Sequence, residues 1–110
     1  MKAKFLNNKI YIKDEDKAYL NANIIDENTI FIELLKVEYK YRNKKVASNM
    51  MEKSIEYLKT KGFKQIYLNA LPLDSFSPPL EKLKTFYKKF DFNEIQSLDN
   101  SNVNLMLKVI

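Results

Sequence analysis

Residues 37–48, with the sequence VEYKYRNKKVAS, mark the point where the chain changes from one periodicity to another. The run before it, TIFIELLKV at residues 29–37, is rich in β-branched and aromatic side chains, which favours a strand. Beyond it, apolar residues recur at the spacing i, i+3, i+4, i+8 and i+11 of one helical face: Ala47, Met50, Met51, Ile55 and Leu58. The sequence therefore predicts a strand that leads directly into an amphipathic helix.

Two more strand-like runs precede this junction, at residues 9–13 and 18–25. The polar segments 14–16 and 26–28 separate the three runs, so we expect an antiparallel meander. The third strand, 29–37, has few polar residues, which predicts a central place in the sheet with both faces covered.

Downstream, Gly62 is the only glycine of the chain, and its place after the helical pattern predicts a helix stop with positive φ. A strand is expected at residues 64–69. A second helix is expected to open at Ser77, with Pro78 at its first position, where a missing N–H costs nothing.

The last part of the chain predicts two closing strands, 92–95 and 103–109, joined by the polar loop 97–102. The resulting order is β-β-β-α-β-α-β-β, and the strand–helix–strand unit implies a parallel crossover. We therefore expect one α/β (α+β) domain over residues 1–110, with a mixed, mostly antiparallel sheet and two main helices.

The composition excludes several kinds of chemistry. The chain has no cysteine and no histidine, so thiol catalysis, disulfides and the commonest metal ligand are ruled out, and no metal is expected. The first residues, 1–9, carry lysines without the apolar run of a signal peptide, which predicts a cytoplasmic protein. A net charge of +5 permits an anionic partner without naming one.

The junction is densely cationic where the helix begins. Arg42, Lys44 and Lys45 stand at the positive end of the helix dipole, where each cation is unfavourable by roughly 0.3–1 kcal/mol. An anion among them, held by the helix's first N–H groups, would reverse this cost. Arg42 is the only arginine, and its planar fork suits phosphate. The stretch predicts a pyrophosphate site; a solvated basic turn is the alternative.

The same stretch resembles the GCN5-related N-acetyltransferases, whose Arg/Gln-x-x-Gly-x-Gly/Ala turn joins the fourth strand to the next helix. Arg42, Val46, Ala47 and Ser48 match in register, while Lys45 and Asn43 replace residues that are commonly glycine. The run LKTFYKKFDF at residues 83–92 resembles the family's Phe-Tyr helix end, and residues 102–108 resemble its last strand.

The resemblance implies a sheet that opens between the strands ending at Val37 and Asn69, with pantetheine bound to the backbone near Leu35 and Val37. The acetyl-CoA site it implies also includes the turn and helix start: Arg42, Asn43, Lys44, Lys45, Val46, Ala47 and Ser48. Tyr87 matches the tyrosine that protonates the departing CoA thiolate, with packing beside Phe86 as the alternative. Glu33 is a candidate base for the amine, with a surface or ion-pair role as the alternative.

Three functions follow from these observations. The first is an N-acetyltransferase that moves acetyl from acetyl-CoA to a primary amine of a small molecule, peptide or protein. The family's usual N-terminal helices are not evident ahead of Arg42, so the acceptor side is expected to be open or completed in a homodimer. The lack of these helices, together with Lys45 and Asn43 in place of glycines, favours the second function, a catalytically inactive acyl-CoA-binding or scaffold module. The third and least favoured is a nucleic-acid-binding protein that uses Tyr39, Tyr41 and the lysines.

Overall fold

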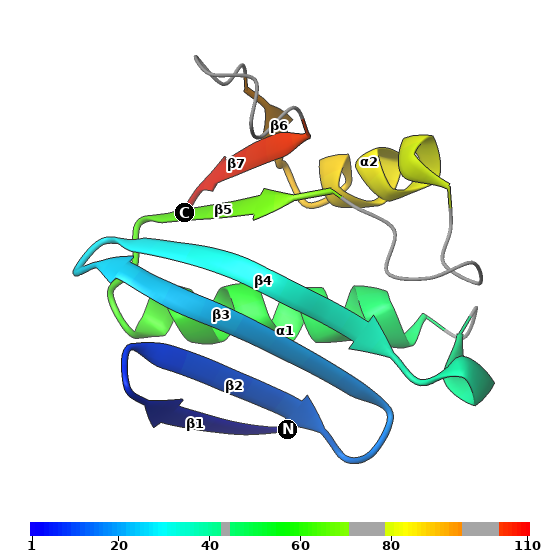
Figure 1. Ribbon diagram of the computed structural model, residues 1–110, viewed down its shortest axis with the longest axis horizontal. Helices are drawn as coiled ribbons and strands as arrows, with labels where there is room; N and C mark the ends of the chain where they lie inside the picture. Colours follow the sequence, from blue (N-terminus) through cyan, green and yellow to red (C-terminus); the bar gives the residue numbers. More distant parts are fainter. Residues whose placement is uncertain (43–44, 71–78, 96–103) are drawn as a thin grey trace.

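The computed structural model describes residues 1–42, 45–70, 79–95 and 104–110. Across these ranges the chain forms a seven-stranded sheet and two α-helices (Figure 1). The strands are β1 (Lys2–Leu6), β2 (Lys9–Asp14), β3 (Ala18–Asp26), β4 (Thr29–Val37), β5 (Gln65–Asn69), β6 (Asn93–Glu94) and β7 (Leu105–Val109). The helices are α1 (Val46–Thr60) and α2 (Leu80–Lys88), and a 3-10 turn, η1, spans Tyr39–Tyr41.

The sheet has the order β1-β2-β3-β4-β5-β7-β6. All neighbours are antiparallel except β4 and β5, which are parallel and are connected through α1. The predicted mixed, mostly antiparallel sheet with two helices is therefore confirmed. The prediction of three strands before α1 was wrong, because β1 precedes them.

Strand β1, which the sequence did not predict, is exposed at every position, so no buried face defines it. It forms because it pairs with β2 across a tight turn. Asn7 and Asn8 occupy that turn with φ of 51° and 62°, the left-handed conformation that two-residue hairpins need and asparagine tolerates.

One face of the sheet carries the core. Alternate strand residues such as Leu20, Ile32 and Leu68 are buried in a single cluster with Met50 and Met51 of α1, which packs against β3 and β4. The expected helical face is thus confirmed, with Ser54 added to it. Strand β4 is central as predicted, but Glu33 and Lys36 are exposed, so the expectation that both its faces are covered was wrong for its second half.

The end of α1 and the start of α2 are marked by a glycine and a proline. Gly62 has φ of 93°, as predicted for the stop after α1. Helix α2 begins at Leu80 with Pro79 as N-cap, later than the predicted start at Ser77. Ser77, Pro78 and the whole loop 97–102 lie outside the described residues. Among the residues that the structure describes, no helix is long and apolar enough to cross a membrane.

Candidate acyl-CoA site

Strands β4 and β5 pair over only part of their length. Their register runs from Thr29↔Gln65 to Ile32↔Leu68, while β4 continues to Val37. Figure 1 shows the end of β4 turning away from β5 beside the start of α1. The two parallel strands therefore diverge beyond Ile32, where the sequence predicted the sheet to open.

In this divergent part of β4, alternate backbone groups point to the side of the sheet on which β5 lies. The N–H of Glu38 donates to the C=O of Lys17 at 2.8 Å, so these two residues form a hydrogen-bonded pair of the antiparallel ladder. Because such pairs alternate, Leu35 and Val37 belong to the non-hydrogen-bonded pairs, and their N–H and C=O groups point away from β3. These are the backbone groups predicted to contact pantetheine.

Arg42 holds the turn that follows β4. Its Nε donates to the C=O of Val37 at 3.0 Å, and its guanidinium lies 5.9 Å from the ring centroid of Tyr39. The side chain is half-buried at the end of the divergent segment. The C=O of Val37, which was assigned to pantetheine, therefore accepts a hydrogen bond from Arg42, which was assigned to phosphate. The sequence did not predict this contact.

Lys45 is the N-cap of α1 and has φ of 60°. This left-handed conformation favours glycine, the residue that the family's turn has at this position. Lys45 makes no side-chain capping hydrogen bond, and the first turn of α1 has no acidic residue. Asn43 and Lys44 lie outside the described residues.

The first N–H groups of α1 are available to an anion by position. Asn49 is the first donor within the helix, to the C=O of Lys45 at 3.1 Å. The N–H groups of Val46, Ala47 and Ser48 therefore have no acceptor inside the helix. Partial positive charge with no acidic side chain in the first turn is the arrangement that phosphate groups favour.

Tyr87 is buried in α2. Its ring packs edge-on against Phe86 and Phe92, with centroids 5.3 Å and 6.0 Å away, so the packing role named as an alternative is real. Burial raises the pKa of Tyr87 to about 12. The phenol is therefore a neutral hydrogen-bond donor at physiological pH and a weaker acid than expected from the sequence.

Glu33 stands where β4 leaves β5. The register passes from Ala22↔Ile32 to Asn21↔Leu34, so Glu33 is the extra residue of a β-bulge directly after the last β4–β5 pair. Its Oε1 accepts a hydrogen bond from Asn23 Nδ2, and its Oε2 lies 3.5 Å from Lys9 Nζ. The ion pair that the sequence left open as an alternative is present, and neither the bulge nor these two partners were predicted.

The exposed aromatics of η1 were proposed to contact nucleic acid. Tyr39 is 70% exposed. Lys17 and Lys40 lie 5.7 Å and 5.2 Å from the ring centroid of Tyr41. Two cations of the same chain therefore already lie beside the Tyr41 ring, where a stacked base would have to bind.

A sequence model of the Acetyltransferase (GNAT) family matches residues 5–92. The chain belongs to the GNAT acetyltransferase family. That match covers β2 to α2 and so includes the divergent strands, the cationic turn and Tyr87. The comparison with curated protein sequences gave no match.

Solved structures of the family share the fold at low identity. Ard1 from Thermoplasma volcanium is 18% identical with a TM-score of 0.66, and the aligned part covers 86% of this chain and 63% of that one. An aminoglycoside 6'-N-acetyltransferase complexed with coenzyme A is 17% identical with a TM-score of 0.69, and the aligned part covers 92% of this chain and 71% of that one. A family member from Elizabethkingia anophelis with acetyl-CoA bound is 16% identical with a TM-score of 0.69, and the aligned part covers 93% of this chain and 75% of that one. The chain thus spans less than two thirds of the length of Ard1.

Proposed function

We propose that this GNAT family member is an N-acetyltransferase that moves the acetyl group of acetyl-CoA to a primary amine by direct attack. The observation that carries the proposal is the divergence of β4 and β5 beside the uncapped, cationic start of α1. One end of this arrangement offers backbone groups to an amide-containing chain, and the other offers N–H groups and cations to phosphates. Acetyl-CoA has both parts, and two of the similar structures hold coenzyme A or acetyl-CoA.

Each part of acetyl-CoA has a matching group in the chain. The backbone of Leu35 and the N–H of Val37 face the divergence and suit the amides of pantetheine. Arg42, Lys45 and the N–H groups of Val46–Ser48 suit the pyrophosphate. We assign Asn43 and Lys44 to the same site on the sequence alone. The cytoplasm remains the proposed location.

The reaction needs a proton acceptor for the amine and a donor for the thiolate. Glu33 is the proposed acceptor, because it lies at the divergence and is exposed enough to meet an incoming amine. Tyr87 is the proposed donor. A pKa of about 12 is well above that of a thiol, near 8.5, so we expect Tyr87 to stabilise the thiolate mainly by a hydrogen bond.

The acceptor amine belongs to a small molecule or to a peptide. Among similar structures, one is an aminoglycoside acetyltransferase, and another is Naa50 of Arabidopsis thaliana bound to the bisubstrate analogue CoA-Ac-MVNAL. In the described part of the chain ahead of α1, residues 1–42, the only helical segment is η1. We propose that the acceptor side is open or completed in a homodimer, so that an amine of a small molecule, peptide or protein can reach it.

The burial of Tyr87 against Phe86 and Phe92 favours one second candidate, an acyl-CoA-binding module without transfer. Release of CoA thiol in the presence of an amine panel distinguishes the two. Transfer that falls in Tyr87→Phe supports the enzyme, whereas acetyl-CoA binding without any thiol release supports the module.

Thermal unfolding with and without acetyl-CoA tests the site itself. A ligand that binds only the folded state, at about 100 times its dissociation constant, should add about 2.7 kcal/mol of stability. We expect this increment to shrink in Arg42→Ala and to persist in the control Lys40→Ala, which removes an exposed cation two residues away. An equal increment in both variants would contradict the assignment of Arg42, and no increment in the wild type would contradict the proposed function.

A further inference from the structure

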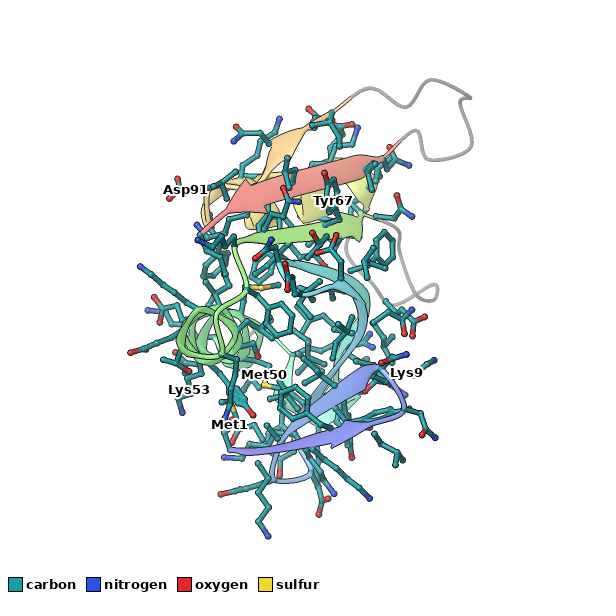
Figure 2. The ribbon with its side chains drawn as sticks, turned by 90° about the vertical axis from the view of Figure 1, so that its left-hand side faces the viewer. Met1, Lys9, Met50, Lys53, Tyr67 and Asp91 are labelled. Carbon is teal, nitrogen blue, oxygen red and sulfur yellow. The ribbon has the colours of Figure 1, made fainter. Side chains whose placement is uncertain are left out.

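The sheet face opposite α1 carries a continuous row of residues. Lys9 pairs with Asn23, Asn23 with Phe31, and Phe31 with Tyr67, so their side chains share one face. All four are half-buried or exposed, in contrast to the buried alternate positions. Figure 2 shows Lys9 on the side of the sheet away from α1. A lysine amine is thus displayed on the open face of the strands that form the site.

The ion pair fixes this amine on the candidate base. Asn23 Nδ2 donates to Oε1 of Glu33, which orients the carboxylate. The other oxygen, Oε2, then faces Lys9 Nζ at 3.5 Å. The side chains of Lys9 and Glu33 are 43% and 39% exposed, so neither is enclosed by the fold. Glu33 therefore already holds a primary amine, the functional group that an acceptor substrate would present to it.

The position of Glu33 connects this amine with the divergence of the strands. Glu33 is the bulged residue that follows Ile32, the last residue of β4 paired with β5. Leu35, whose backbone faces the divergent side, is two residues further along the same strand. The backbone of Glu33 thus lies where the proposed acetyl-CoA site begins, and its carboxylate extends across β3 to Lys9 on β2.

We propose that Lys9 is an internal acceptor, and that the protein acetylates its own Lys9 side chain from acetyl-CoA. The inference rests on the proposed function. The Lys9 ammonium gives one proton to Glu33, and the free Nζ attacks the thioester carbonyl. The N–C bond forms and the C–S bond breaks; the nitrogen loses a second proton to solvent, and the thiolate takes one up. One acetyl-CoA yields one acetyl-lysine, one CoA thiol and one proton.

Acetylation would also change the site. Acetyl-lysine carries no positive charge, so the Lys9–Glu33 ion pair is lost and Oε2 of Glu33 becomes free to meet an external amine. Lys9 is therefore both a modification site and a competitor of the acceptor for the same carboxylate oxygen.

Lys13 provides a matched control for chemical acetylation. It lies on β2 like Lys9, is 51% exposed, and pairs with the carboxylate of Asp16 at 3.1 Å rather than with Glu33. We would incubate the full chain with acetyl-CoA and follow each lysine by peptide mass mapping. We expect Lys9 to be acetylated before Lys13, at a fractional rate that does not change on dilution of the protein.

Glu33→Gln should slow acetylation of Lys9 about tenfold or more, because a positioned general base contributes roughly 10²–10⁴-fold. The rate at Lys13 should stay the same in that variant. Equal rates at Lys9 and Lys13, an unchanged Lys9 rate in Glu33→Gln, or a rate that rises with protein concentration would each overturn the proposal.

Two further readings separate this inference from the proposed function. If acetyl-CoA stabilises the protein and an added amine is acetylated while Lys9 stays unmodified, only the internal acceptor is wrong. If acetyl-CoA gives no thermal stabilisation and no transfer, both the proposed function and this inference are overturned.

Discussion

At the scale of single residues, Lys45 combines an unfavourable backbone conformation with a position in the proposed acetyl-CoA site. Its φ of 60° is unfavourable for any residue with a Cβ by roughly 1–2 kcal/mol. Glycine removes that cost but adds about 0.5–1 kcal/mol of chain entropy to the unfolded state. We expect Lys45→Gly to raise the free energy of unfolding by up to about 1 kcal/mol, and Lys45→Val to lower it, in urea titrations. A Lys45→Gly variant that is clearly less stable would mean that the lysine side chain itself stabilises the turn.

Tyr87 gives a prediction for pH. Its pKa is near 10 in an unfolded chain and about 12 in the folded protein, so between these values the folded state holds more protons than the unfolded one. Its contribution is fully present below pH 10 and is lost as pH rises toward 12, by about 2–3 kcal/mol. We expect Tyr87→Phe to reduce this alkaline loss, measured by urea unfolding from pH 8 to 11.5. The control Tyr11→Phe, at a 37% exposed position, should keep the wild-type slope; equal slopes in all three proteins would contradict burial as the cause.

At the scale of elements, the start of helix α1 combines an unfavourable electrostatic terminus with the proposed phosphate site. Ser48 is the third residue of α1, where a carboxylate would complement the helix dipole by roughly 0.3–1 kcal/mol. Ser48→Glu should therefore raise the melting temperature of the free protein and decrease the stabilisation by acetyl-CoA, because the new charge repels phosphate. Ser48→Gln is the uncharged control and should change neither quantity much. If Ser48→Glu left the acetyl-CoA increment intact, the phosphates would not lie at this terminus.

The elements also show which features can be read from sequence. Strand β4 and helix α1 were predicted closely because burial on a defined face leaves a periodic apolar pattern. Strand β1 was not predicted, since its five residues are exposed and the strand depends on its pairing with β2.

For the candidate site, the cationic turn was visible in the sequence because charge at a helix start is a local property. The partners of Glu33 were not, since Lys9 and Asn23 reach it only through the pairing of three strands and a bulge. The elevated pKa of Tyr87 was hidden for the same reason, because it depends on rings brought together by the fold.

At the scale of the whole molecule, electrostatics should govern how acetyl-CoA is bound. The chain carries 19 basic and 14 acidic residues, a net charge of +5, and three of the basic residues, Arg42, Lys44 and Lys45, directly precede α1, whose first turn has no acidic residue. Salt shortens the Debye length from about 10 Å at 0.1 M to about 3 Å at 1 M, so contacts between exposed cations and phosphates weaken. We expect the affinity for acetyl-CoA, measured by calorimetry, to fall as the salt concentration rises. S-acetylpantetheine without its phosphates is the matched ligand: it should bind more weakly and with little dependence on salt, because it retains only the contacts to the backbone of β4. If the affinity for acetyl-CoA depended on salt as little as that for acetylpantetheine, the assignment of the pyrophosphate to the start of α1 would be wrong. The proposed contacts to the backbone of β4 would not be affected.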